Sequence, residues 1–168
     1  MARATYARLG GVAALITGGL LIGASAASAQ DFTFDLPAGT ACAFALRVTG
    51  TGYQPKVREF VDQDGNVVRT VSAGTGQALT LTNLSAPDES IALRSNGTAT
   101  HTTINADGTQ TVTSTGHHLL ILFPTDDPAG PSTTLVAGHY VYTVGTDGVF
   151  HVQRISGKTT DICTLLTP

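Results

Sequence analysis

Histidine and aspartate side chains are the groups of this chain best suited to chemistry, and several of them crowd into one stretch. TGHHLLILFPTDDPAGPS, residues 115–132, places His117 beside His118 and, after an apolar run, Asp126 beside Asp127. Imidazoles and carboxylates bind zinc and similar ions, and they act as general acids and bases. A metal or catalytic site is therefore the first hypothesis that this stretch raises.

The apolar run between these pairs argues against a metal site. In an extended strand His117 and His118 point to opposite faces, so they cannot easily hold one ion together. Further ligands would have to come from His101, His139 or His151, and His139 is close only if its strand neighbours that of His117. Loose arrangements of this kind recur by accident. We expect neither a metal nor another cofactor.

The same run, LLILF at residues 119–123, is apolar on both faces of a strand. A sandwich strand needs only one apolar face, so the second must be covered by the chain itself or by a partner, including a second copy of the chain. The face of His118, Leu120 and Leu122 is the candidate interface, because a histidine at its edge tolerates partial exposure to solvent.

The segment that follows is rich in proline. Pro124, Pro128 and Pro131 end the strand and stiffen a surface loop, in which Asp126 and Asp127 are expected to be solvated turn residues. An inhibitor of a hydrolase presents one rigid loop of this kind to its target. The loop is therefore the best candidate for such a role.

One segment resembles a calcium loop. VDQDGNVV offers Asp62, Asp64 and Asn66 at alternating positions, as the first part of an EF-hand loop does. The glycine and the glutamate that complete such a loop are missing from their places. Asp-Gly between valine-rich runs is typical of a hairpin turn, which is the favoured interpretation.

Local signatures of catalysis are absent from the sequence. It contains no G-x-S-x-G, S-x-x-K or H-E-x-x-H motif and no phosphate-binding glycine motif. No catalytic residue is therefore predicted. A hydrolase with an unmarked site, such as a pair of carboxylates, is still open.

The N-terminus has the pattern of a secretory signal peptide. Arg3 and Arg8 precede the apolar run GVAALITGGLLIG, and the small residues up to Ala29 suit cleavage there. We expect residues 1–29 to be removed and residues 30–168 to form a single secreted domain without a membrane span. That chain has seven basic and twelve acidic residues, a net charge of about −5 that predicts no nucleic-acid binding.

The mature chain contains two cysteines, Cys42 and Cys163. In an oxidising extracellular setting an even pair favours a disulfide, and two thiols are too few for a structural zinc site. The alternative is a pair of buried free thiols. The predicted bond would join the first strands to the last.

The elements that must position these residues are β-strands. Phe32, Phe34 and Leu36 alternate along FTFDL, and CAFALRV at residues 42–48 alternates in the same way. Asp-Gly or Asn-Gly pairs separate such runs. VVRTVSAG, TQTVTSTG and VFHVQRISG end alike, which indicates a faint repeat or a shared hairpin pattern. We predict roughly eight to ten strands in an all-β, two-sheet antiparallel sandwich, immunoglobulin-like or jelly-roll-like, with a small β-barrel as the alternative.

Three stretches carry a resemblance to known proteins. They are QDFTFDLPAGTAC near the mature start, GHHLLILFPTDDPAGPSTT in the middle and SGKTTDIC near the end. With these stretches the chain resembles a group of small secreted actinobacterial proteins. The resemblance implies export, a β fold and the pairing of Cys42 with Cys163, and it brings no activity with it.

These observations favour a secreted, non-enzymatic β-sandwich module that binds an extracellular protein or a component of the cell envelope, or that forms part of an outer layer. A hydrolase inhibitor and a hydrolase with an unmarked site are the alternatives. A sugar-binding module is a weaker form of the first hypothesis, because the mature chain has no Trp. Tyr140 and Tyr142 share one strand face, which favours core packing.

Overall fold

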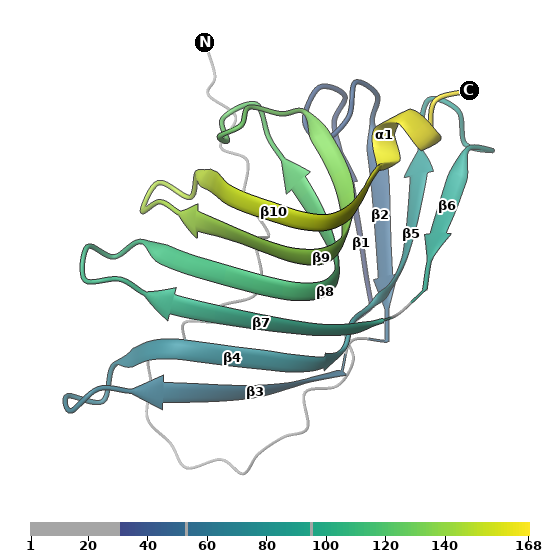
Figure 1. The fold of residues 1–168 in the computed structure, drawn as a ribbon. Coiled ribbons are helices and arrows are strands. Elements are labelled where there is room, and N and C mark those ends of the chain that lie inside the picture. The colour runs from purple at the N-terminus through teal and green to yellow at the C-terminus, as the bar shows by residue number, and fades with distance from the viewer. Residues whose placement is uncertain (1–30, 53, 95) are drawn as a thin grey trace.

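The computed structural model describes residues 31–52, 54–94 and 96–168, which form two antiparallel sheets (Figure 1). Sheet A has the strand order β1-β2-β5-β6, with β1 (Phe32–Leu36), β2 (Leu46–Thr51), β5 (Ala78–Asn83) and β6 (Ser90–Leu93). Sheet B has the order β10-β9-β8-β7-β4-β3, with β3 (Gln54–Val61), β4 (Val67–Thr75), β7 (Gly97–Ile104), β8 (Gln110–Leu122), β9 (Ser132–Val144) and β10 (Phe150–Asp161). A short helix, α1 (Ile162–Leu165), follows β10. The predicted signal peptide lies outside the described residues.

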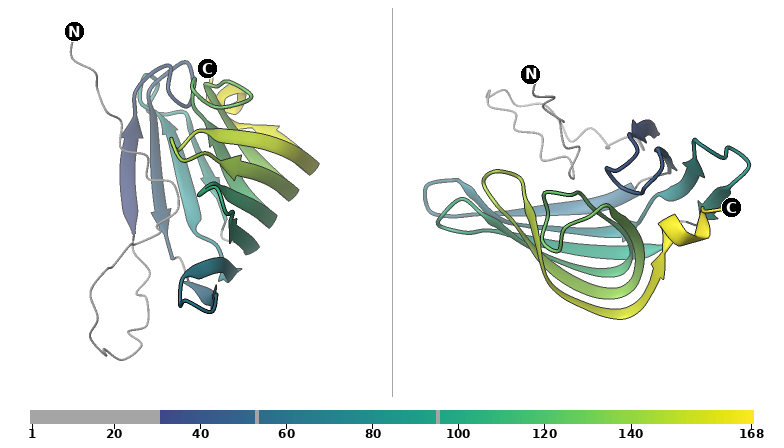
Figure 2. Two further views of the ribbon diagram at one scale, coloured as in Figure 1. Left: turned by 90° about the vertical axis from the view of Figure 1, so that its left-hand side faces the viewer. Right: turned by 90° about the horizontal axis from the view of Figure 1, so that it is seen from above.

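The strands of sheet A run steeply across those of sheet B, and sheet B is strongly curved (Figures 1 and 2). The chain passes from one sheet to the other at the β2–β3, β4–β5 and β6–β7 links, as is usual where two sheets pack at a large angle. The two sheets do not close on each other. The predicted two-sheet sandwich is therefore confirmed, and the barrel alternative is wrong.

Sheet B is built from three hairpins that share one sequence pattern. Each turn has an Asp-Gly pair whose glycine adopts a positive φ, at residues 64–65, 107–108 and 147–148. In the first turn the Asp62 carboxylate accepts hydrogen bonds from the N–H groups of Asp64 and Asn66, at 2.9 and 2.8 Å. The calcium-like segment is thus a hairpin turn, as predicted. The three similar strand endings belong to the second strands of these hairpins, β4, β8 and β10.

A row of mostly glycine residues crosses sheet B at its bend. Neighbouring strands pair the members of the row one to one, in the order Pro55, Gly74, Thr98, Gly116, Gly138 and Gly157. Gly116 and Gly157 have φ values of 108° and 109°, a region that favours glycine. A Cβ atom on Gly138 would collide with the carbonyl oxygen of Ser156 in the next strand. The row therefore allows the backbones to bend and to approach closely.

The glycine row divides the molecule into two halves. The hairpin half consists of the three hairpin arms, residues 56–73, 99–115 and 139–156. The core half consists of sheet A, α1 and the strand ends at residues 117–122, 132–137 and 158–161. Buried apolar side chains of the core half come from both sheets and from the C-terminus, among them Leu46, Val48, Leu81, Ile162 and Leu166, with Leu119, Ile121 and Leu135 packed against them.

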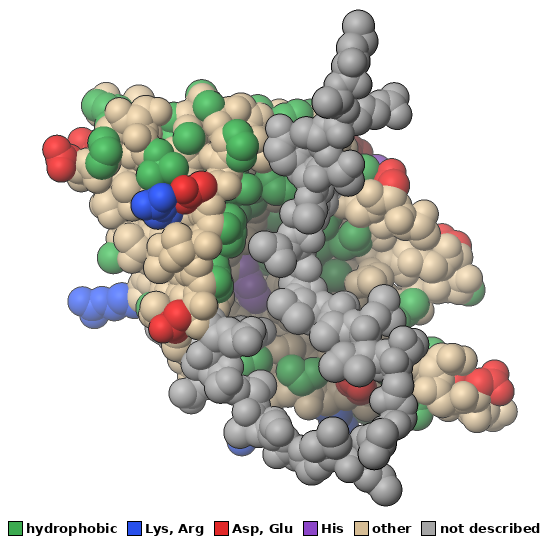
Figure 3. Space-filling model, turned by 180° about the vertical axis from the view of Figure 1, so that it is seen from behind, with side chains coloured by type: hydrophobic (Ala, Val, Ile, Leu, Met, Phe, Trp, Pro, Cys, Tyr) green, Lys and Arg blue, Asp and Glu red, His purple; other side chains and the backbone are tan. Residues whose placement is uncertain are grey.

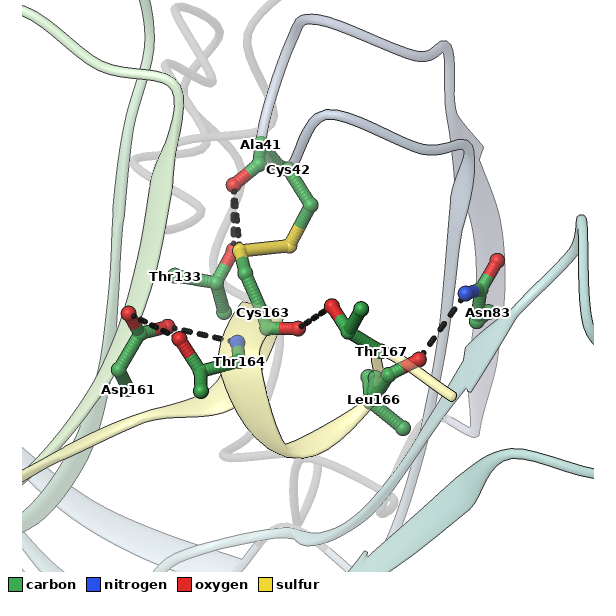
Figure 4. The surroundings of a disulfide bond; sticks show 9 residues. All are labelled: Ala41, Cys42, Asn83, Thr133, Asp161, Cys163, Thr164, Leu166 and Thr167. Carbon is green, nitrogen blue, oxygen red and sulfur yellow. Dashed lines mark hydrogen bonds between the residues drawn. A yellow bond between two sulfur atoms is a disulfide. The ribbon is translucent and has the colours of Figure 1, made fainter.

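A disulfide between Cys42 and Cys163 fastens α1 to the loop before β2 (Figure 4). The Cα atoms of the two cysteines are 5.5 Å apart, and Cys42 is buried. Beside the bond, the buried Thr133 hydroxyl donates a hydrogen bond to the Ala41 carbonyl oxygen at 3.0 Å, and Asp161 caps the helix. The predicted disulfide is confirmed, and it ties the start and the end of the described chain into the core half.

Candidate binding faces of the six-stranded sheet

One face of sheet B turns inward, and aromatic rings line it along β8, β9 and β10. His118, Tyr140, Tyr142 and Phe150 follow one another in ring contacts, with centroid separations of 5.5, 5.5 and 4.9 Å. On the same face β4, β7 and β8 present hydroxyl side chains, namely Thr70, Ser72, Thr98, Thr100, Thr102 and Ser114. Seen from behind, hydrophobic side chains and a histidine line the hollow between the sheets (Figure 3). We call this surface the inner face.

The inner face also holds the residues of the predicted interface. Leu120 and Leu122 are only 4% and 5% exposed, and they pack in one cluster with Tyr140 and its aromatic neighbours. His118, at the edge of the cluster, is half-buried. The bend at the glycine row turns the strand ends over the aromatic residues of their own sheet. The chain itself therefore covers both leucines, which is the first of the two alternatives considered above, and leaves them little apolar surface for a partner.

The proline loop covers the edge of β10 next to this cluster. The prediction that Asp126 is a solvated turn residue is wrong, because its side chain is buried and accepts hydrogen bonds from the N–H groups of Phe123 and Phe150, at 2.6 and 2.9 Å. Asp127 is exposed, as predicted, and its backbone exchanges hydrogen bonds with Phe150 and Val152, at 2.8 and 2.7 Å. The buried carboxylate thus fixes the loop against β10.

Burial changes the titration of two kinds of group on the inner face. It lowers the pKa of the His118 imidazole, an effect that a hydrogen bond to Thr115 partly offsets. The Nε2 atom of His118 donates that bond to the Thr115 carbonyl oxygen at 3.0 Å, since a carbonyl can only accept. Burial also raises the pKa of the Tyr140 and Tyr142 phenols, so both stay protonated at neutral pH.

These groups do not form the pair of nucleophile and base that covalent catalysis requires. Ser114 is buried, and its hydroxyl lies 3.3 Å from that of Thr100 and interacts with the Tyr140 phenol. His118 has Nε2 engaged with a backbone carbonyl, and among the described residues no carboxylate contacts its ring. A serine nucleophile needs a base that reaches it and a third group that orients the base. The inner face is suited to contact through rings and hydroxyls rather than to proton transfer.

The histidines are spread over both faces of sheet B. His117 is exposed on the face opposite His118, as predicted, and His139 lies on the neighbouring strand β9 on the same face as His117. His101 and His151 are exposed. Within the described ranges, no group of three or more His, Cys, Asp or Glu side chains could hold a metal ion.

The outer face of the hairpin half gathers positive charge. Of the seven Lys and Arg residues between positions 31 and 168, four are exposed on this face, namely Lys56, Arg58, Arg69 and Arg154. A fifth, Lys158, follows directly after Gly157. The acidic residues within the described strands of sheet B, Glu59 and Asp161, pair with Thr70 and Thr134 on the inner side.

The sequence alone does not predict this cationic face. The alternation of Lys56, Arg58 and Phe60 along β3 is a signal that places them on one side of a strand. The pairing of Phe60 with Arg69 on β4 could be known only from the strand register. The net charge of about −5 does not reveal that basic side chains lie on one face of the sheet, because it is a sum over turns, both sheets and both faces.

Comparisons with protein-family models, with curated proteins and with solved structures find no match to this chain. No helix within the described residues is long and apolar enough to cross a membrane. The assignment of a function therefore rests on the surfaces described above.

Proposed function

We propose that the mature chain is a secreted, non-enzymatic binding module that holds an extracellular partner on its hairpin half. One observation carries the proposal: the outer face of the hairpin half is a broad, exposed sheet surface with four cationic side chains and no acidic residue among its described strand positions. Charge segregated in this way steers and orients a partner of opposite sign. The disulfide is compatible with an extracellular location.

The distribution of buried residues supports a binding role for this half. The disulfide, α1 and the larger apolar cluster all lie in the core half, where they stabilise the fold. The outer strand positions of the hairpin half carry mainly threonine, histidine and cationic side chains. These side chains contribute little to a core and much to contact with a hydrated partner.

Retention by isolated bacterial cell envelopes tests the proposal. The mature chain, residues 30–168 with its disulfide intact, would be mixed with envelope fragments and sedimented at low and at high salt. We expect retention at low salt and release at high salt, because salt screens interactions between exposed charges. Full recovery of the protein in the supernatant at both salt concentrations would refute binding, and turnover of a chromogenic hydrolase substrate would refute the non-enzymatic assignment.

The proline loop supports a second candidate function, inhibition of a secreted hydrolase. Its exposed residues Pro124, Thr125 and Pro128 are presented on a segment that buried Asp126 fixes to β10. A loop held in one conformation binds without a large loss of conformational entropy. Inhibition of any protease or glycosidase in a panel, lost on the substitution Thr125→Arg, would favour this candidate over the first.

A further inference from the structure

We infer that the outer face of the hairpin half binds a linear acidic polysaccharide, an inference that rests on the binding function proposed above. The centre of the site is the edge formed by β3 and β4, where Arg58 and Arg69 share the ring of Phe60. The Cζ atoms of these arginines lie 4.9 and 3.9 Å from the ring centroid. Because both distances are measured to the same centroid, the two guanidinium carbons lie close together, separated by at most the sum of the two distances.

No acidic side chain pairs with these two guanidinium groups within the part of the chain that the structure describes. Glu59 belongs to the inner face, and Asp62 in the adjacent turn has its carboxylate engaged by turn N–H groups and by Asn66. Arg47 in sheet A, by contrast, pairs with Asp35 at 2.7 Å. Like charges held close to one ring favour the binding of an anion beside them. Stacking on Phe60 restricts both guanidinium planes while leaving their edge N–H donors for carboxylate oxygens.

The cationic surface extends across the sheet to its other edge. Arg154 on β10 occupies the same face there, and the exposed Lys158 follows it. Between the edges, the central strands β7, β8 and β9 present hydroxyl side chains on the outer face, namely Thr103, Thr111, Thr113 and Thr143. With about 4.8 Å between neighbouring strands, the two edges are about 24 Å apart along the sheet. A chain of several sugar-acid units spans this distance, offering carboxylates at both edges and hydroxyl groups between them.

The side chains of this face favour a sugar acid over other polyanions. Single-stranded nucleic acid binds by stacking its bases on exposed aromatic rings, whereas Phe60 is already covered by two guanidinium groups. A membrane surface takes up exposed apolar side chains. Most exposed large apolar side chains of the hairpin half do not lie on the outer face between the edges. Val57, Ile104 and Ile155 belong to the inner face, and Val61 and Val68 lie beside the β3–β4 turn. The outer face offers charge and hydroxyl groups, which are the complement of an acidic polysaccharide.

Affinity electrophoresis of the mature chain in gels that contain alginate, a linear polyuronate, tests the inference. We expect alginate to retard the protein at low salt and neutral dextran to leave its mobility unchanged. The double variant Arg58→Gln/Arg69→Gln should bind alginate roughly 25-fold more weakly, about fivefold for each cation removed, with an unchanged melting temperature. Arg94→Gln, which removes an exposed charge outside this face, is the matched control and should bind within about twofold of the wild type.

Four results would overturn the inference. They are the absence of retardation by alginate, an equal loss of binding in Arg94→Gln, and tighter binding either of single-stranded DNA or of anionic phospholipid vesicles than of alginate. If cell envelopes retain the protein while alginate does not, the ligand class is wrong and the binding function stands. If neither cell envelopes nor alginate retains the protein, both the ligand class and the binding function are wrong.

Discussion

The core half and the hairpin half consist of the same kind of antiparallel strand, yet they differ in which side chains are buried and which are charged and exposed. In the core half both sheets and the C-terminus contribute fully buried side chains such as Leu46, Leu81 and Ile162, and a disulfide joins the first loop to the last helix. In the hairpin half the outer strand positions carry mainly cationic, histidine and threonine side chains, and Lys56, Arg58 and Arg69 are exposed. We therefore expect stability to be concentrated on the core side of the glycine row, while the other side carries the charged surface.

The bend between the two halves also explains why aromatic residues lie on the inner face of the hairpin half. Tyr140 and Tyr142 lie in the hairpin half but are covered by Leu120 and Leu122, which come from the core half across the bend. The bend thus extends apolar packing over the inner face only. The outer face receives no such cover from the strand ends at residues 117–122 and 132–137, and it carries the charges instead.

Removal of the disulfide, which belongs to the core half, should lower the stability of the protein more than any other change predicted below. In the variant Cys42→Ala/Cys163→Ala we expect the free energy of unfolding to fall by about 4 to 5 kcal/mol, because the bond closes a loop of 121 residues in the unfolded chain. Urea unfolding of both proteins measures the loss. The intact wild type should also take up no thiol-alkylating agent unless it is first reduced. Alkylation of both cysteines without reduction would contradict the structure.

Substitution in the glycine row tests the boundary between the halves. Gly138→Ala places a Cβ atom against a backbone carbonyl of β10, so we expect a loss of about 3 kcal/mol, the upper end for overpacking. Gly97→Ala is the control, since its Cβ atom would meet nothing within 4 Å. Thermal unfolding compares the two variants. Equal melting temperatures would show that the row does not require glycine.

The buried carboxylate of the proline loop should have an intermediate effect. Asp126→Asn weakens hydrogen bonds to two backbone N–H groups, and we expect a loss of about 2 kcal/mol. The exposed neighbouring carboxylate provides the control variant Asp127→Asn, which should leave stability nearly unchanged. If the two variants unfold at the same denaturant concentration, Asp126 does not hold the loop.

The smallest expected effect is a pH dependence that arises from His118. Burial lowers the pKa of this imidazole in the folded state, so the unfolded chain binds more protons as the pH falls through the ordinary value of 6.5. Stability from this group is therefore present above pH 6.5 and declines below it. Between about pH 7.5 and 5 the variant His118→Gln should lose less stability than the wild type. His101→Gln, at an exposed position on another strand, should follow the wild type, and a parallel course for all three proteins would exclude the effect.

Much of the fold could be predicted from local patterns. Alternation in FTFDL and the Asp-Gly turns predicts strands and hairpins. The even number of cysteines, in a chain that is expected to be exported, predicts the bond between Cys42 and Cys163. These features depend on residues close in sequence or on a single pair. The hairpin pattern shared by β4, β8 and β10 is visible in the sequence, but the alignment of Gly116, Gly138 and Gly157 across strands is not.

The candidate surfaces depend on contacts that no local pattern encodes. Asp126 resembles a turn residue in sequence, and only the return of the loop to β10 gives its carboxylate two buried donors. Arg58 and Arg69 become neighbours through the register of β3 and β4. Net charge, as a sum over the chain, cannot report how charge is divided between two faces of a sheet.

Hydrogen–deuterium exchange of backbone amides tests the division into two halves most directly. Amides of β2 and β5, whose side chains lie in the main apolar cluster, should exchange only through global unfolding, so that exchange slows as overall stability rises. Amides of β3 and β4 between residues 56 and 73 should exchange through local opening, faster by at least about tenfold. Equal protection of the two pairs of strands would contradict the concentration of stability in the core half.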